Sequence, residues 1–562
     1  MAIKISRRQT LALAASTALA GSAGLFAAQA QDAGDQVRKI ILFAFPQNAN
    51  PQSYQASQLV AQTWRRLGLD VEVRPIPWQQ HSQVVWNERE RWDTTMWRMV
   101  GRPERSDPDE LAYNLFRSDN IDKGYNFVGW NNKEYDELSV KQRQAAGAED
   151  RKKALHDMQK LVDREQPYGF LVHPKWVMAF NANVFDEKTI VKQSGIGLRS
   201  FWTFTGATPT GAKKDIVINS GQPLNAVHPL WVSGGTDSWM TELVWDRLVR
   251  IGADGLPKPW AAEKFEVKDS TTVEVTLRQG MTFSDGKPVT MDDVMFSYLA
   301  PLQGTKVPMY RPFVADIASI DKVSETVLRF KLKAPNAAFV TTSLAKMNII
   351  PKHIWEPVLA SLEGKPENIE SVRDISHVGS GPYKLARARL SEEIVLERNA
   401  AHFAAPKAER LILRIIPNVE AVLGMLRSGE INMLTDYGGD PEVIEKLSKD
   451  NPHIRLVAEV DLGFEFVAFN HRRAPFNDTA FRRALSLSLD RKQMVNAGWG
   501  GYAVTANSHI SPSLAAWHDN SIDDPKSGLD LAKEILDKAG YKVVGGRLRY
   551  PAGAKENLKP GE

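Results

Sequence analysis

The sequence predicts an α/β fold with at least two lobes, and two observations support this prediction. First, residues 40–45 form a short apolar run, residues 52–67 place apolar side chains at helical spacing, and residues 71–74 alternate as a strand. A strand–helix–strand unit of this kind indicates a parallel sheet covered by helices. Second, the turn-rich segment 206–212 separates this region from a new strand at 216–218.

Strands and helices continue toward the C-terminus. Residues 272–277 and 328–332 alternate between apolar and polar side chains, which predicts half-buried strands. Residues 411–416 predict another strand, and a helix is expected to begin at Glu420. A last helix is expected over 529–539, because its apolar side chains recur at helical spacing and a glycine follows it.

Length and composition exclude several classes of protein. A chain of 562 residues with 43% hydrophobic and 25% charged residues is ordinary for a globular protein and unlike a disordered, collagen-like or coiled-coil chain. Three of the 71 lysines and arginines lie in residues 1–30, so the rest carries one more basic than acidic side chain. This balance lacks the basic excess of a nucleic-acid-binding protein. The absence of cysteine excludes disulfides, cysteine-ligated zinc and thiol catalysis.

Residues 1–30 have the layout of a cleaved signal peptide. A basic start precedes an uncharged run over 9–30 that ends in Ala-Gln-Ala. The letters SRRQTL at 6–11 resemble the twin-arginine export motif, with Thr10 where that motif usually has Phe. We therefore expect export to the periplasm. A membrane anchor is the weaker alternative, because the run is rich in Ala, Ser, Thr and Gly.

Catalytic and cofactor motifs are not apparent in the sequence. It contains no Gly-x-Ser-x-Gly elbow, no His-Glu-x-x-His helix, no Walker loop and no dinucleotide-binding glycine motif. Residues 343–346 fit Ser-x-x-Lys but lack the companion motifs of a penicillin-recognising enzyme. We therefore expect a binding protein without cofactor or metal rather than an enzyme. A secreted hydrolase is the alternative from a different class.

One stretch combines aromatic and cationic side chains after a predicted strand. Such groups can hold a ligand by stacking and by bidentate pairing with carboxylates. The other interpretation is that the tryptophans fill a core while the arginines cover a surface. The residues are Trp86, Arg89, Arg91, Trp92, Trp97, Arg98, Arg102 and Arg105.

From Thr241 onward the sequence resembles the extracellular solute-binding proteins of family 5, the peptide- and nickel-binding type that serve ABC importers. The letters ELVWDRLV at 242–249 and LRQGMTFSDGKPVTMDDV at 277–294 are similar to long family motifs. Shorter similar motifs follow in family order at 334–339, 350–354, 378–383, 426–431, 469–478, 482–485 and 490–491.

The resemblance implies a two-lobed periplasmic-binding-protein fold with a hinge and mixed sheets covered by helices, but in an unusual order. Residues 37–200 resemble the second half of the family. The stretch 532–541, which includes most of the last predicted helix, resembles the helix that, in the family, leads into the strand that here starts near Arg38. We interpret this order as a circular permutation within lobe II. A gene-model or fusion artefact that joins two partial copies is the alternative.

The expected division follows from this interpretation. Residues 1–30 form the signal peptide, 37–195 the second part of lobe II, and 196–213 a return segment and linker. Residues 214–468 form lobe I, and 469–562 form the first part of lobe II.

The resemblance also implies a function. The two lobes of a monomer would close on a peptide or peptide-like amino-acid derivative and deliver it to an inner-membrane ABC permease. An opine, a sugar or a metal chelate is the alternative ligand within the same class.

The ligand-binding residues implied by the resemblance centre on one loop. In peptide-binding members an acidic residue three positions before an Asp-Pro pair binds the ligand's amino group, which here points to Glu104. Counting from the preceding strand instead points to Arg102, which with Arg98 or Arg105 would favour a carboxylate. Alternatively, Glu104 pairs with one of these arginines on the surface. The further candidates are Trp97, Asp107, Asn219, Trp245, Gly379, Trp499 and Asn507.

Overall fold

A computed structural model describes residues 34–554, except for residues 78, 79, 82, 102, 123, 146, 233, 234, 373, 374 and 524. The expected signal peptide lies outside the described residues. Among the described residues, no helix is both long and apolar enough to cross a membrane.

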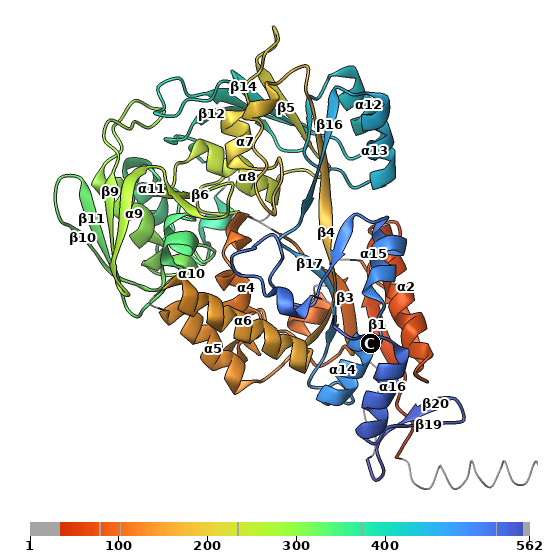
Figure 1. The fold of residues 1–562 in the computed structure, drawn as a ribbon. Coiled ribbons are helices and arrows are strands. Elements are labelled where there is room, and N and C mark those ends of the chain that lie inside the picture. The colour runs from red at the N-terminus through yellow and green to blue at the C-terminus, as the bar shows by residue number, and fades with distance from the viewer. Residues whose placement is uncertain are drawn as a thin grey trace, which may run out of the picture.

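Lobe II is built on one sheet with the strand order β2-β1-β3-β17-β4 (Figure 1). The strands are β1 (Ile40–Ala44), β2 (Val71–Pro75), β3 (Thr94–Met99), β17 (Phe464–Phe469) and β4 (Tyr168–Asn181). β1 pairs in parallel with β2 and β3, whereas β17 pairs antiparallel with β3 and β4. Helix α2 (Pro51–Arg65) connects β1 to β2, which confirms the predicted strand–helix–strand unit.

Helices cover both faces of this sheet because alternate side chains of β1 point to opposite sides. Ile40 and Leu42 pack with α2, α14 (Thr479–Leu487), α15 (Arg491–Trp499) and α16 (Leu529–Lys538). Ile41 and Phe43 pack with α4 (Asp109–Asn114), α5 (Lys133–Gln144) and α6 (Ala148–Glu165). Burial on both faces explains the continuously apolar sequence of β1.

Lobe I contains two four-stranded sheets around one large apolar core. The first sheet is mixed, because β14 pairs in parallel with β5 and antiparallel with β13. Its strands are β12 (Tyr383–Arg389), β13 (Glu393–Arg398), β14 (Arg410–Ile415) and β5 (Asp215–Ser220). The second, antiparallel sheet contains β10 (Ile317–Lys322), β11 (Val327–Leu332), β9 (Thr272–Leu277) and β8 (Ala262–Asp269).

Helices and short strands complete lobe I. The helices are α7 (Phe201–Gly206), α8 (Gly235–Val244), α9 (Met291–Leu299), α10 (Arg311–Val314), α11 (Lys352–Ala360), α12 (Val419–Ser428) and α13 (Pro441–Asp450). Short strands β6 (Val249–Ile251) and β7 (Pro257–Pro259) pair with each other. The return segment joins this lobe, since Leu198, Phe201 and Phe204 lie in its core.

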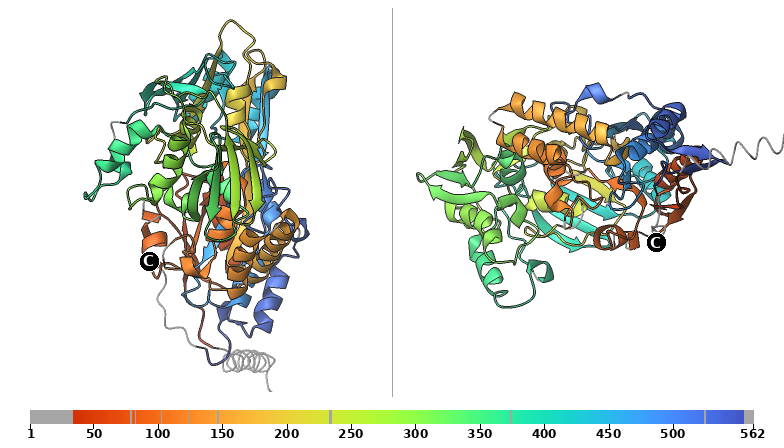
Figure 2. Two further views of the ribbon diagram at one scale, coloured as in Figure 1. Left: turned by 90° about the vertical axis from the view of Figure 1, so that its left-hand side faces the viewer. Right: turned by 90° about the horizontal axis from the view of Figure 1, so that it is seen from below.

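The lobes are connected by β4 and by the antiparallel segment that runs from β16 into β17, which together form the hinge. Figure 2 shows the elongated shape of the molecule. β4 has 14 residues, and its first half pairs with β17 and β18 (Ala503–Thr505) in lobe II. Its second half pairs with β16 (Ile454–Val460) and β15 (Met433–Leu434) on the lobe I side. The predicted two-lobed α/β fold is therefore confirmed. The exact residue division of the lobes stays a prediction.

The first described residues lie beside the last. The backbone N–H of Gly34 donates to the carbonyl of Tyr550 at 2.9 Å, and that of Val37 to the carbonyl of Leu548 at 2.9 Å. Leu548 belongs to the hairpin of β19 (Lys542–Val544) and β20 (Arg547–Arg549), which follows α16. A circular permutation requires such neighbouring ends. The permutation itself stays a prediction.

Asp93 joins three segments that are far apart in the sequence. Its buried carboxylate forms ion pairs with Arg38 at 2.8 Å and with Arg473 at 2.9 Å, and it accepts a hydrogen bond from the backbone N–H of Ile41 at 3.1 Å. We expect Asp93→Ala to lower the free energy of unfolding by about 3–5 kcal/mol, because the substitution leaves buried cations without their partner. Urea denaturation followed by tryptophan fluorescence measures this loss.

Glu72→Gln provides the control for Asp93→Ala. Glu72 pairs with Lys39 and Arg74 on the surface, where such pairs contribute at most about 1 kcal/mol. Equal effects of the two substitutions would contradict the role assigned to Asp93.

Glu465 makes stability depend on pH. It is buried on β17, with the Ser53 hydroxyl at 3.4 Å, and burial raises the pKa of Glu465 to about 7 although nearby Arg98 opposes this rise. Between its ordinary pKa of about 4.3 and pH 7, the folded protein holds a proton that the unfolded chain releases. The free energy of unfolding should therefore fall by up to about 3 kcal/mol as the pH rises through this window.

Denaturation series between pH 4.5 and 8 on the wild type and Glu465→Gln check this prediction. The neutral amide removes the titrating group, so the difference in stability between the two proteins should change with pH. A constant difference would refute the assignment.

Candidate functional site

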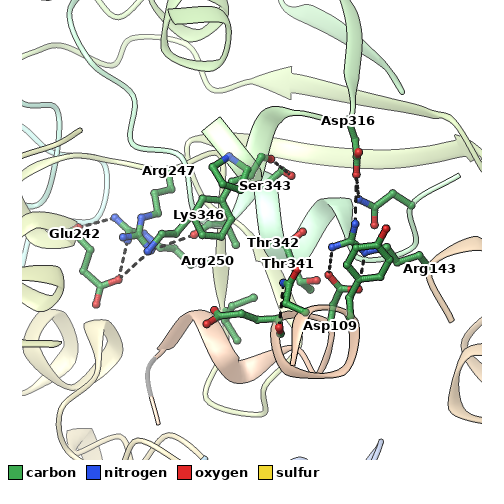
Figure 3. A pocket seen from close by; sticks show the side chains of 18 of the residues that line it. Asp109, Arg143, Glu242, Arg247, Arg250, Asp316, Thr341, Thr342, Ser343 and Lys346 are labelled. Carbon is green, nitrogen blue, oxygen red and sulfur yellow. Dashed lines mark hydrogen bonds and ion pairs between the residues drawn. The ribbon is translucent and has the colours of Figure 1, made fainter. Parts of the chain in front are cut away.

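A cavity of about 340 Å³ lies where the two lobes face each other (Figure 3). Lobe II contributes α4 and α5 to its lining. Lobe I contributes α8, β6, α10 and the short helical turn η6 (Val340–Leu344). The walls carry ionisable groups of both signs, and Figure 3 shows how these groups are arranged in pairs.

The lobe II wall centres on a bidentate ion pair. The guanidinium of Arg143 donates to both carboxylate oxygens of Asp109, at 2.8 and 2.7 Å, and lies 3.4 Å from the ring centre of Tyr113. Burial alone would lower the pKa of Arg143, but Asp109 raises it above its ordinary value. This wall therefore presents a fixed carboxylate beside a permanently charged arginine.

The lobe I wall has an excess of positive charge. Arg247 and Arg250 share one carboxylate, Glu242, at 3.5 and 3.2 Å. Burial and the repulsion of Arg247 lower the pKa of Arg250 to about 9, although Glu242 opposes the shift. The ammonium of Lys346 lies 5.4 Å from the ring centre of Phe313 on the same side. This wall can therefore bind an anionic group.

Three contacts connect the lobes at the cavity. The hydroxyl of Thr341 in lobe I donates to the Asp107 carboxylate of lobe II at 2.6 Å. Arg143 reaches Asp316 at 3.8 Å, and its backbone carbonyl accepts from the N–H of Ala337 at 2.6 Å. These contacts hold the lobes together around the cavity.

Asp107 thus lies beside the cavity but also anchors lobe II. Burial would raise the pKa of Asp107, but two hydrogen bonds from Arg151, at 2.5 and 3.0 Å, lower it. The carboxylate is therefore ionised and accepts from both lobes at once.

The loop implied by the resemblance is only partly described. Arg102 lies outside the described residues, and so does the side chain of Glu104, whose backbone belongs to the short helix η2 (Pro103–Ser106). Arg105 is buried and donates to Glu110 at 2.9 Å. Which group of this loop faces a ligand stays a prediction.

Arg98 and Trp97 lie on β3 with different surroundings. Arg98 forms an ion pair with buried Asp461 in the connection from β16 to β17, and lies 4.4 Å from the ring centre of Trp176. Trp97 packs in the aromatic core of lobe II, 5.6 Å from Phe127 between ring centres. The interpretation that the tryptophans of this stretch fill a core describes Trp97.

The remaining candidates do not line the cavity between the lobes. The side-chain amide of Asn219 donates to the backbone carbonyl of Asp436 at 2.6 Å and accepts from the backbone N–H of Thr435 at 2.9 Å. The indole N–H of Trp245 donates to the carbonyl of Val378 at 3.0 Å. A side-chain carbon at Gly379 would lie 2.0 Å from the carbonyl oxygen of Val244, so close packing requires glycine there.

The last two candidates lie in lobe II. Trp499 belongs to the lobe II core cluster that also contains residues of α2 and α16. The amide of Asn507 donates to the carbonyl of Asp523 at 2.9 Å. The structure therefore places Asp107 behind the cavity lining, hydrogen-bonded to Thr341, and leaves these two residues elsewhere.

Sequence reasoning missed most of the charged lining of the cavity. Glu242 and Arg247 lie inside the motif ELVWDRLV, which could have marked them as candidates. Arg143 lies on a polar helix with many similar side chains, so its sequence gives no signal of its position.

Solved structures of solute-binding proteins are similar to this chain. The oligopeptide-binding protein AppA of Bacillus subtilis, solved with a nonapeptide, has a TM-score of 0.47 at 24% identity, covering 61% of this chain and 67% of that chain. NikZ of Campylobacter jejuni, solved with Ni(L-His), has a TM-score of 0.48 at 21% identity, covering 60% and 66%.

Curated relatives match part of the chain. The oligopeptide-binding protein AppA of Bacillus subtilis is 29% identical over 290 residues, covering 50% of this chain and 51% of that protein. The periplasmic oligopeptide-binding protein OppA of Salmonella typhimurium is 30% identical over 355 residues, covering 58% and 63%. Heme-binding protein A of Haemophilus influenzae is 26% identical, covering 57% and 60%.

The chain thus spans between half and two thirds of the length of these relatives. Residues 257–560 match the family model described as bacterial extracellular solute-binding proteins, family 5 middle. Because this match covers more than half of the chain, the protein belongs to the bacterial extracellular solute-binding proteins of family 5.

Proposed function

We propose that the protein is the substrate-binding component of an ABC importer and that it captures a peptide or peptide-like amino-acid derivative between its lobes. Relatives named for oligopeptide and dipeptide binding support the ligand class. The inferred export signal supports a periplasmic location, and the proposed partner is an inner-membrane permease.

The observation that carries the proposal is the cavity between the lobes. A free peptide has an amino group at one end and a carboxylate at the other. The cavity is lined by the carboxylates of Asp109 and Asp316 and by the cations of Arg247, Arg250 and Lys346. A site with charges of both signs suits such a ligand better than an uncharged sugar, which needs mainly hydroxyl-binding and stacking groups.

The contacts between the lobes explain how binding could be transmitted. A ligand that touches both walls favours the closed arrangement, in which Thr341 bonds Asp107. A permease that recognises the closed arrangement would then accept loaded protein. No bond of the ligand is made or broken in this process.

A hydrolase remains the rival function, and the geometry at Ser343 does not favour it. The Ser343 hydroxyl donates to the carbonyl of Phe313, while the ammonium of Lys346 lies over aromatic rings. Neither contact pairs the serine with a general base. Turnover of a generic ester, abolished by Ser343→Ala, would support the rival.

Native mass spectrometry of protein purified from the periplasm tests the proposal. Spectra before and after mild denaturation should reveal a released small molecule whose mass identifies its class. If the signal peptide is removed, the measured protein mass should equal that of a chain that begins near residue 31. Bare protein that gains no thermal stability from peptide mixtures would contradict the proposed function.

Thr341→Val should weaken closure of the lobes. The substitution keeps the shape of the side chain but removes a hydrogen bond to a buried carboxylate, worth about 1.5–3 kcal/mol. Affinity for a peptide mixture should fall by about tenfold or more. Small-angle scattering of the unliganded protein should show a larger radius of gyration.

Thr342→Val is the matched control. The Thr342 hydroxyl donates to the carbonyl of Ala338 at 2.8 Å, within lobe I. This substitution should leave the radius of gyration unchanged. Equal effects of the two substitutions would show that the contact with Asp107 does not hold the lobes together.

A further inference from the structure

Near the hinge, one buried arginine has no anionic partner among the described residues. The side chain of Arg199, in the return segment, is 6% exposed. Within the described part of the chain, no carboxylate forms an ion pair with its guanidinium, and its Nε is buried without a hydrogen-bond partner. A buried cation is costly to leave uncompensated, so its position calls for an explanation.

Two tryptophans hold the Arg199 guanidinium. Its central carbon lies 3.6 Å from the ring centre of Trp176 and 4.9 Å from that of Trp239. Contact with aromatic faces stabilises a guanidinium without using its N–H groups. The donors of Arg199 therefore stay available to another partner.

The charged groups around Arg199 are a second arginine and two carboxylates. Arg98 lies over the same Trp176 ring, 4.4 Å from its centre, and forms an ion pair with Asp461. Asp436 opposes the effect of burial on Arg199 more strongly than Asp461 does, and its carboxylate also accepts from the N–H of Gly221 at 2.8 Å. Two arginines and two carboxylates thus lie together, but among the described residues neither carboxylate forms an ion pair with Arg199.

Arg199 nevertheless keeps its charge at neutral pH. Burial lowers the pKa of Arg199 to about 10, and the repulsion of Arg98 adds to this effect, while Asp436 and Asp461 oppose it. The buried cation therefore persists in the protein under physiological conditions.

Both lobes and the hinge contribute to this cluster. Arg98 comes from β3 of lobe II, and Trp239 comes from α8 of lobe I. Trp176 lies on β4, and Asp461 immediately follows β16. An anion bound here would contact elements on both sides of the hinge.

We propose that Arg199, together with Arg98, forms a binding subsite for a carboxylate group of the ligand. A planar carboxylate can accept two parallel hydrogen bonds from a guanidinium, and the flanking tryptophans exclude water from that contact. The inference deepens the proposed function and rests on it, because it assigns an anionic ligand group to a defined place beside the hinge.

Thermal unfolding without ligand distinguishes a binding role from a structural one. Arg199→Met removes a buried cation that has no ion pair among the described residues and keeps an apolar chain between the tryptophans, so the unfolding temperature should rise or stay unchanged. Arg482→Met is the matched control, since buried Arg482 donates to Phe476 and Glu165 carbonyls at 2.8 and 3.1 Å. That substitution should lower the unfolding temperature.

Binding of a simple carboxylate is the second measurement. Sodium acetate should raise the unfolding temperature of the wild type above that in sodium chloride of equal ionic strength. Arg199→Met should abolish the difference, and Arg199→Lys should retain part of it, because lysine keeps the charge but loses the bidentate geometry. An acetate effect that survives in Arg199→Met would overturn the inference.

A comparison of two peptide mixtures then tests whether the subsite binds the ligand of the proposed function. In native mass spectrometry, wild-type protein should retain peptides with free C-termini at least about tenfold better than the same peptides with amidated C-termini. Arg199→Met should remove this preference.

The outcomes separate the two proposals. Equal retention of both mixtures would support peptide binding and overturn the carboxylate subsite. An acetate response without retention of either mixture would support the anion subsite and contradict peptide binding. A lowered unfolding temperature of Arg199→Met without any acetate response in the wild type would make Arg199 structural and overturn the inference.

Discussion

The arrangement of the whole molecule depends on the backbone hydrogen bonds of β4. This strand pairs with β17 in one lobe and with β16 on the side of the other, so its N–H and C=O groups are satisfied from both sides of the hinge. Buried backbone groups need such partners, which fixes the register of both lobes along one strand. The cavity and the cluster around Arg199 both take their positions from this shared strand.

A second constraint is that charged groups buried between the lobes need partners. Asp107 and Asp109 are buried, yet each is ion-paired with an arginine of its own lobe. This internal pairing keeps the lobe II wall stable whether or not the lobes are closed. Arg199 differs, because its support within the described residues is aromatic. Asp107 and Asp109 are thus compensated within the fold, whereas Arg199 is the residue to which we assign a ligand carboxylate.

The elements of the fold could be predicted well from local patterns. The strand at Ile40–Ala44, helix α2 and helix α16 have periodicities that reflect burial on one or two faces, and local burial decides them. The turn-rich segment 206–212 indicated at least two lobes, and the family motifs indicated their hinged arrangement. Pairing of β17 between β3 and β4 depends on contacts between segments hundreds of residues apart, and no local pattern encodes it.

The candidate site was less predictable, for a related reason. Arg98 and Asp107 were recognisable because they follow a strand or form a motif. Trp245 and Gly379 belong to equally specific motifs, but hydrogen bonding and close packing explain those residues. Arg143 and Arg199 become notable only once the fold shows which charges surround them. A sequence pattern gives the type of a side chain and not its partners.

The place of β17 in the lobe II sheet also has a consequence in time. Its two neighbours, β3 and β4, are complete once residue 181 has been synthesised, but the strand that fills the space between them ends at residue 469. At ordinary rates of translation, the intervening segment takes on the order of 15–60 s to emerge. During that interval the edges of β3 and β4 that β17 will cover have no partner from this sheet, and such edges invite aggregation. The lobe II sheet can therefore be completed only after the strands of both four-stranded sheets of lobe I have been synthesised.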